Sequence, residues 1–319
     1  MIEVNDDVTK TNLETALRVL PRSIRQKILN ATMQYSNKIQ EVVLRAEKPV
    51  CVCVDGVYKF VTNNGCVTDS SCTQELIKTS VSEVAECFNN VCGYSVYSHL
   101  NEIKEGFLTI RGGHRVGISG TAVVSSDSIM NIRDISTISI RISRQIIGCA
   151  EKVTENFVRN TGGMLICGSP CSGKTTVIRD MARILSSDYG RRVSLVDTRG
   201  ELAAVYQGVN QNDVGLCDVM NGYPRAAAIE HSVRSLSPEF IICDEIGSSS
   251  DVRAIMSGVN SGVRFIATIH ASTKDELRGR NAVRQILETD AFESVIFLYG
   301  RDRPGQFSDK YTKDEILNG

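Results

Sequence analysis

The sequence has no tryptophan, only 6% aromatic residues, and a formal net charge of −1 over 319 residues. Proteins that bind nucleic acid usually show a basic surface, and those that hold single strands also offer aromatic side chains for stacking. The overall composition therefore argues against a nucleic-acid-binding protein. A local basic patch is still compatible with these totals.

Long apolar runs are missing as well. No uninterrupted apolar stretch approaches the roughly 18 residues that a membrane-spanning helix requires. Residues 1–7 are rich in acidic side chains and do not contain the apolar segment of a secretory signal. We therefore expect a cytoplasmic protein.

The eleven cysteines form no recognisable framework. Their number is odd, and several lie inside apolar runs such as residues 164–167 and 240–243. The pairs Cys51/Cys53 and Cys87/Cys92 do not have the spacing of a zinc site. We expect reduced thiols that pack as small core residues.

A change of pattern near residue 145 predicts two domains, 1–145 and 146–319. The first is expected to be a smaller mixed α/β domain without a nucleotide motif. Its predicted helices are 9–36 (broken at Pro21), 74–91 and 95–103. Its predicted strands are 39–44, 50–54, 57–61, 107–111, a segment ending near 124, and 138–144. A surface loop is expected over 125–128.

The second domain alternates strand-like and helix-like segments. The predicted strands are 164–167, 193–196, 240–243, 264–269 and 294–299. This alternation predicts a mostly parallel sheet with helices on both faces. Ligands bind at the carboxyl ends of the strands in such sheets, so we expect a site where the first three strands end, at Gly168, Asp197 and Asp244.

The strongest single motif follows the strand 164–167 and precedes an amphipathic helical run. It matches the phosphate-binding P-loop, and its predicted nucleotide contacts are Gly168, Ser169, Pro170, Cys171, Ser172, Gly173, Lys174, Thr175 and Thr176. Backbone N–H groups of such a loop and the start of the following helix attract phosphate oxygens. Lys174 can reach the β- and γ-phosphates of ATP, and the Thr175 hydroxyl can ligate Mg²⁺.

Two pairs of acidic residues follow later strands. Asp244 is a candidate outer-shell Mg²⁺ residue, and Glu245 beside it is a candidate general base for the attacking water. The alternative is a solvated pair that caps the next helix. Asp197 and Glu201 are weaker candidates for holding Mg²⁺ or water, because a structural turn explains them as well.

The strand 264–269 ends at His270, where a polar side chain can sense the γ-phosphate, although a structural histidine fits equally. Several arginines have no evident partner in the sequence. Arg133, Arg141 and Arg144 are candidates for completing an ATP site in trans, as arginine fingers do. The alternative for each is a solvated side chain.

The order of these motifs resembles that of the hexameric ATPases of type II and type IV secretion and of type IV pili. Those proteins carry a P-loop, an acidic box, a second acidic strand end and a histidine box, here matched by Lys174, Asp197, Asp244 and His270. More narrowly, residues 40–300 are similar to the family of stage III sporulation protein AA. The segments that carry this likeness are GFLTIRGGHRVG over 106–117, IRDIS over 132–136 and GKTTVIRDMAR over 173–183.

The resemblance implies a RecA-like core, Mg²⁺-dependent ATP hydrolysis and a ring, typically hexameric, that the N-terminal domain helps to build. It also implies a cytoplasmic protein on the mother-cell side that docks on membrane proteins of the channel to the forespore. His270 then becomes the histidine-box residue. In close relatives we expect an acidic residue at the position of Thr198 and a basic one at that of Ser248. The sequence therefore leaves open which acidic residue of the acidic box is functional.

Three functions therefore compete: an oligomeric motor or assembly ATPase, a scaffold that binds ATP with little turnover, and a nucleic-acid translocase on the same core. The near-neutral charge and the absence of tryptophan disfavour the third. The first is our prediction, with Lys174, Thr175, Asp244 and Glu245 at its centre.

Overall fold

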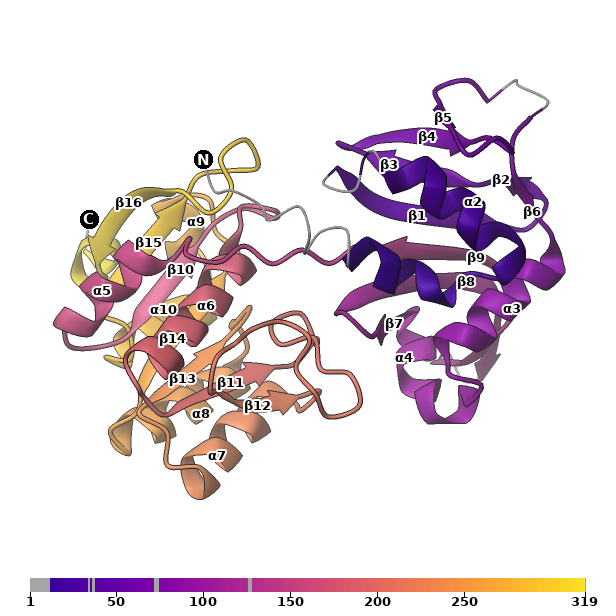
Figure 1. Cartoon of the computed structure of the whole chain (residues 1–319). Coiled ribbons are helices and arrows are strands. Elements are labelled where there is room, and N and C mark those ends of the chain that lie inside the picture. Colours follow the sequence, from indigo (N-terminus) through magenta and orange to yellow (C-terminus); the bar gives the residue numbers. More distant parts are fainter. Residues whose placement is uncertain (1–11, 34, 36–37, 72–74, 126–127, 319) are drawn as a thin grey trace. The chain divides into compact units, whose positions relative to one another are not determined.

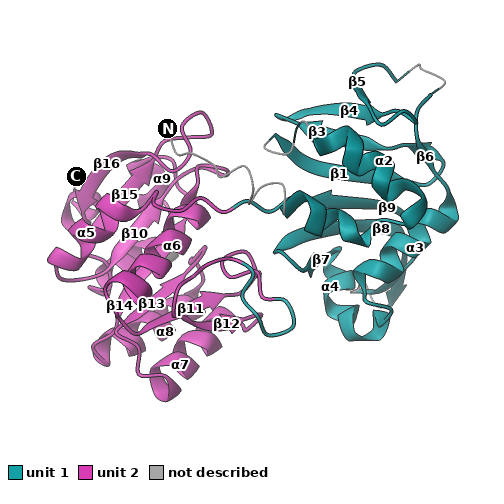
Figure 2. Cartoon of the chain, in the orientation of Figure 1, with its two compact units in different colours: residues 1–144, 206–211 teal, residues 145–205, 212–319 magenta. Residues whose placement is uncertain are grey.

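The computed structural model describes residues 12–318, apart from 34, 36–37, 72–74 and 126–127. It divides into two compact units (Figure 2): unit 1 comprises residues 1–144 and 206–211, and unit 2 comprises residues 145–205 and 212–319. Both units combine helices with a sheet, so the α/β prediction is confirmed. No helix within the described ranges is long and apolar enough to cross a membrane.

Unit 1 is built on an antiparallel sheet of seven strands (Figure 1). In spatial order they are β5 (Val67–Thr68), β4 (Val57–Val61), β3 (Cys51–Val54), β1 (Ile39–Arg45), β9 (Ser128–Arg141), β8 (His114–Ser125) and β7 (Phe107–Ile110). A short separate pair joins β2 (Lys48–Pro49) to β6 (Lys78–Thr79). The hairpin predicted over 50–61 is confirmed, because β3 and β4 pair antiparallel there.

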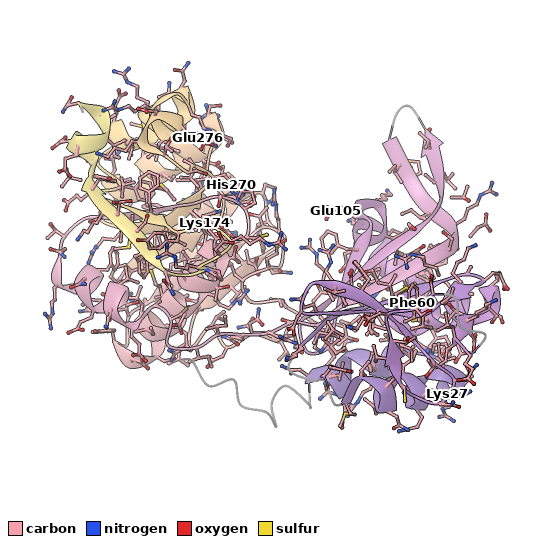
Figure 3. The ribbon with its side chains drawn as sticks, turned by 90° about the horizontal axis from the view of Figure 1, so that it is seen from above. Lys27, Phe60, Glu105, Lys174, His270 and Glu276 are labelled. Atoms are coloured by element: carbon pink, nitrogen blue, oxygen red, sulfur yellow. The ribbon has the colours of Figure 1, made fainter. Side chains whose placement is uncertain are left out.

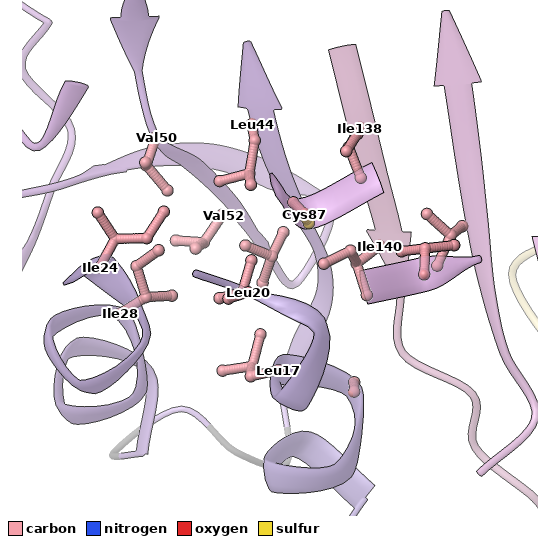
Figure 4. Packing of buried hydrophobic residues seen from close by; sticks show 14 of the residues in the cluster. Leu17, Leu20, Ile24, Ile28, Leu44, Val50, Val52, Cys87, Ile138 and Ile140 are labelled. Atoms are coloured by element: carbon pink, nitrogen blue, oxygen red, sulfur yellow. The ribbon is translucent and has the colours of Figure 1, made fainter. Parts of the chain in front are cut away.

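One face of this sheet is covered by helices. They are η1 (Leu17–Val19), α2 (Arg22–Met33), α3 (Val81–Val91), η2 (Val96–His99) and α4 (Leu100–Glu105). Successive side chains of a strand point to opposite faces of the sheet, so every second residue points to this face. Examples are Leu44, Val52 and Ile140. They pack against the buried stripe of α2, which includes Ile24 and Ile28 (Figure 4).

Two predictions for unit 1 differ from the structure. The helix expected over 74–91 begins only at Val81, because Ser80 caps it in a reciprocal capping box with Glu83. The strand expected from residue 138 begins at Ser128, and β9 pairs with β8 along most of its length. Part of the loop expected over 125–128 is therefore the end of this hairpin, and residues 126–127 lie outside the described residues.

Unit 2 contains a second sheet of seven strands. In spatial order they are β12 (Asp218–Asn221), β11 (Val193–Asp197), β13 (Phe240–Cys243), β14 (Arg264–Ile269), β10 (Met164–Cys167), β15 (Ser294–Leu298) and β16 (Phe307–Thr312). All neighbours are parallel except β15 and β16. The five predicted strands are confirmed, whereas β12 and β16 at the two edges were missed.

Helices cover both faces of this sheet, as predicted (Figure 1). Along β13, Phe240 and Ile242 face one side, and Ile241 and Cys243 face the other. The first side packs against α5 (Glu151–Arg159), α6 (Lys174–Arg183) and η3 (Ile184–Asp188); the second packs against α7 (Arg225–Ser235), α8 (Ser249–Asn260), α9 (Lys274–Arg278), α10 (Asn281–Glu288) and α11 (Lys313–Leu317). Since β10, β11, β13 and β14 are parallel, their carboxyl ends meet at one edge.

The cysteines among the described residues are free thiols, and most are buried. Burial raises the pKa of Cys87 to about 12 and that of Cys243 likewise to about 12. These thiols stay protonated near neutral pH and act as small apolar residues, as predicted.

Candidate functional site

The P-loop runs from the end of β10 to the first turn of α6. Cys171 and Gly173 adopt left-handed backbone conformations, with φ of 63° and 91°. Ser172 is fully buried, and its Oγ makes no hydrogen bond to any part of the chain that the structure describes. The loop therefore holds a buried hydroxyl that a ligand oxygen can satisfy.

Close packing explains why residue 173 is glycine. The Gly305 N–H donates to the Ser172 carbonyl oxygen at 2.7 Å, which brings the loop after β15 against the P-loop. A Cβ atom added to Gly173 would lie 2.5 Å from the Gly305 nitrogen. The positive φ and this contact both favour glycine.

We expect Gly173→Ala to weaken ATP binding at least tenfold and to lower the free energy of unfolding of unit 2 by about 1–3 kcal/mol. The matched control is Gly190→Ala, because Gly190 also has positive φ (60°) but has no atom within 4 Å of an added Cβ. Titration calorimetry and thermal unfolding of both variants measure the two effects. Equal behaviour of the two variants would show that the contact with Gly305 is unimportant.

The P-loop lines a cavity of about 480 Å³. Its walls include residues 170–176, together with Glu201, Glu245, His270 and Pro304. Gly168 and Ser169 are absent from these walls, but their carbonyl oxygens accept hydrogen bonds from Lys174. This volume lies in the range of about 300–1,000 Å³ that is usual for small-molecule sites.

Lys174 lies at the centre of the site and is 5% exposed. Its Nζ donates to the carbonyl oxygens of Gly168 and Ser169 at 2.8 and 2.9 Å, and it lies 3.1 Å from His270 Nδ1. Figure 3 shows where Lys174 and His270 lie in unit 2. Burial lowers the pKa of Lys174, while the charges of Asp244 and Glu245 act in the opposite direction. The ammonium group is thus positioned beside the P-loop before any phosphate arrives.

Asp244 connects two elements of the site. Its Oδ2 accepts a hydrogen bond from the Thr175 hydroxyl at 2.8 Å. Its Oδ1 accepts one from the Thr268 hydroxyl, and the oxygen of that hydroxyl accepts the Glu245 N–H at 2.9 Å. The predicted Mg²⁺ pair, Thr175 and Asp244, is therefore brought together by α6 and β13.

Glu245 is held in a strained backbone conformation, with φ of 51°. Its Oε2 lies 2.6 Å from Arg199 Nη1, and its Oε1 lies 2.8 Å from His270 Nε2. Lys174 can only donate, so His270 Nδ1 accepts from it and Nε2 carries the hydrogen donated to Glu245. A continuous chain of contacts thus joins Lys174, His270, Glu245 and Arg199.

Asp197 has a structural role. Its carboxylate accepts hydrogen bonds from the N–H groups of Glu201, Leu202 and Ala203 at 2.8–3.1 Å. Burial raises its pKa, and these bonds act against the rise. These bonds hold the following loop, and Asp197 also lines a small cleft together with Asp244, so its Mg²⁺ role stays a prediction.

The loop held by Asp197 is also tied to the P-loop helix. Arg179 of α6 donates to the carbonyl oxygens of Leu202 and Glu201 at 2.8 and 2.6 Å. Glu201 is among the residues that line the P-loop cavity, in agreement with its predicted position. The acidic box is therefore brought to the site mainly through backbone contacts.

The three arginines predicted to act in trans belong to unit 1. Arg141 lies 3.6 Å from Glu41, and Arg133 lies 3.6 Å from Asp134. Arg144 donates to the Ile39 carbonyl oxygen at 2.6 Å, and burial lowers its pKa. These contacts lie within unit 1, and action in trans stays a prediction.

The side chains present fit a Mg²⁺–triphosphate. The Lys174 ammonium, the buried Ser172 hydroxyl and the open backbone of the loop suit phosphate oxygens, and the Thr175–Asp244 pair suits a hydrated cation. Sequence reasoning assigned no role to Arg199, Thr268 or Gly305. Arg199 and Thr268 lie inside segments that carry motif residues, whereas nothing in the sequence identifies Gly305.

A comparison with family models matches residues 10–317 to the family described as "Sporulation stage III, protein AA". The chain is 32% identical over 302 residues to stage III sporulation protein AA of Bacillus subtilis, covering 93% of this chain and 94% of that protein. It is also 33% identical over 153 residues to Protein SEEDLING PLASTID DEVELOPMENT 1 of Arabidopsis thaliana, covering 47% of this chain and 22% of that protein.

Two solved structures show the fold. The Legionella pneumophila ATPase DotB matches with a TM-score of 0.52 at 18% identity, covering 93% of this chain and 77% of that one. The pilus retraction motor PilT with bound ADP matches with a TM-score of 0.54 at 17% identity, covering 81% of this chain and 74% of that one. These matches confirm the predicted RecA-like fold.

Proposed function

The chain belongs to the sporulation stage III, protein AA, family, and we propose that it hydrolyses ATP as a motor or assembly ATPase of a secretion-like channel between mother cell and forespore. The observation that carries this proposal is the 2.8 Å hydrogen bond between Thr175 and Asp244, with Lys174 and Glu245 beside it. This is the arrangement that a Mg²⁺–ATP site needs.

In the proposed reaction a water oxygen attacks the γ-phosphorus, and the bond from that phosphorus to the bridging oxygen of ADP breaks. Lys174 orients the phosphates and offsets their charge. Glu245 orients the water and accepts its proton as the new bond forms. Arg199 and His270 each contact one carboxylate oxygen of Glu245, and each oxygen keeps a second lone pair that can accept the proton.

Thr175 and Asp244 are the residues that would hold Mg²⁺, Thr175 directly and Asp244 through water. When bound, the ion supplies charge neutralisation between the β- and γ-phosphates. Glu201 lines the same cavity and is positioned to hydrogen-bond water there.

We further propose a homo-oligomeric ring, typically hexameric, in which arginines of unit 1 complete the ATP site of a neighbouring copy. The ring would be cytoplasmic, dock on membrane proteins of the channel from the mother-cell side, and bind no nucleic acid. Family membership supports these finer statements, which rest on the likeness to sporulation proteins and secretion ATPases.

A size measurement by light scattering, made with and without Mg²⁺–ATP on samples also assayed for phosphate release, tests this function. We expect ATP-dependent assembly accompanied by turnover. Assembly without turnover, even with the membrane partners added, would instead support a scaffold that only binds ATP. Turnover stimulated by single-stranded DNA would support a translocase.

A further inference from the structure

A second cavity, of about 560 Å³, lies in unit 1 and is strongly basic. Four arginines line it, from three segments of the chain, while Glu86 is the carboxylate among its lining residues. The arginines are Arg18 of η1, Arg22 and Arg25 of α2, and Arg111 after β7. The chain as a whole has a net charge of −1, so positive charge is concentrated locally at this cavity.

The positive charges at this cavity form no ion pairs with carboxylates in the part of the chain that the structure describes. By contrast, Arg141 and Arg133 of the same unit each lie 3.6 Å from one. Like charges gathered around one space repel each other, and an anionic ligand relieves that repulsion.

The helices that carry the arginines are firmly anchored. Leu17 and Leu20 beside Arg18, and Ile24 and Ile28 of α2, are buried in the core of unit 1 (Figure 4). The three arginines of η1 and α2 therefore lie on the side of these helices that faces away from that core, while Arg111 follows β7. The cavity is thus presented by a rigid framework.

Polar groups along the cavity are also pre-arranged. Arg25 Nε and Nη2 both donate to the Leu20 carbonyl oxygen, at 3.0 and 2.5 Å, which fixes the plane of its guanidinium and leaves Nη1 for a ligand. Asn90 donates to the Val19 carbonyl oxygen at 3.0 Å and accepts from the Tyr94 hydroxyl at 2.8 Å. An ordered site of this kind loses little conformational entropy when a ligand binds.

We propose that this cavity binds a ligand that carries two or more phosphate groups. Guanidinium groups form bidentate hydrogen bonds with phosphate, and four of them suit more than one phosphate. The volume suits a nucleotide or a lipid headgroup, while a single cavity of this size does not provide the extended basic track of a nucleic-acid-binding surface. The phosphates come either from a free compound or from an anionic phospholipid.

The test uses the full chain carrying Lys174→Ala, so that the P-loop does not contribute phosphate binding. Pyrophosphate is titrated by calorimetry, and vesicles of phosphatidylcholine with and without cardiolipin are used in flotation. Each assay is repeated with Arg22→Glu and with Lys27→Glu, which makes the same charge change on the same helix but outside the lining residues. Arg111→Gln provides a second, milder change at the cavity.

We expect Arg22→Glu and Arg111→Gln to weaken binding at least tenfold, and Lys27→Glu to have a much smaller effect. Binding of pyrophosphate alone identifies a free phosphate compound, and binding of cardiolipin vesicles identifies a lipid headgroup. No binding of either probe, or a loss of binding in Lys27→Glu equal to that in Arg22→Glu, would overturn the proposal.

Discussion

Glu245→Gln is expected to lower ATP turnover at least about 100-fold while ATP binding stays close to that of the unchanged protein. The amide cannot accept a proton from water, but it has almost the same size and still accepts a hydrogen bond from His270 or Arg199. Phosphate release and equilibrium ATP binding, measured on the same preparation, separate these two effects.

Glu230→Gln is the matched control, since Glu230 is an exposed residue of α7 paired with Arg234 and lies outside the P-loop cavity. It should hydrolyse ATP at the unchanged rate. If Glu245→Gln turns over as fast as this control, Glu245 is not the general base. The same pair of variants distinguishes a motor from a scaffold. A scaffold would still function in the Glu245→Gln variant, which lacks ATP turnover, whereas a motor would not.

Unit 1 is expected to lose stability as the pH falls from about 6.5 to about 4, through His114. Burial lowers the pKa of His114 from 6.5 to about 4. Its Nδ1 accepts the Ser143 N–H at 3.0 Å, so a second ring proton would face that donor. The unfolded chain binds the proton more readily, and the stabilisation present above pH 6.5 decreases by about 3 kcal/mol in this window.

Urea unfolding at several pH values, followed by hydrogen exchange of β8 and β9, measures this loss within unit 1. His114→Gln removes the titrating group, and its unfolding free energy should depend much less on pH over the same range, whatever its absolute stability. An unchanged pH dependence in that variant would show that other groups cause the loss.

The core of unit 2 could be predicted because its strands are buried on both faces and read as continuous apolar runs. The P-loop motif and strand ends then located Lys174, Thr175, Asp244 and Glu245 at one edge, and the structure brings these side chains together. The edge strands β12 and β16 could not be predicted, since exposed edge strands contain polar residues and lack that pattern.

The long β8–β9 hairpin was hard to predict for another reason. Its pairing shifts register between Ser119 and Thr121 and again between Val123 and Val124, so the period-2 pattern is interrupted. Arg199 was missed because its contact with Glu245 joins the loops that follow β11 and β13, and no local sequence pattern indicates such a pairing. The carboxylate of Asp197 accepts hydrogen bonds from backbone N–H groups. Because every residue except proline has such a group, the sequence does not indicate this role.

We expect Lys174, Thr175 and Asp244 to form one Mg²⁺–ATP site. The most direct test is the affinity for ATP with and without Mg²⁺, measured by calorimetry for the unchanged protein, Asp244→Asn and the control Asp218→Asn on the exposed edge strand β12. We expect Mg²⁺ to strengthen ATP binding by the unchanged protein and by the control. Asp244→Asn should lose most of this Mg²⁺-dependent increase in ATP affinity. Equal Mg²⁺ dependence in all three proteins would contradict this expectation.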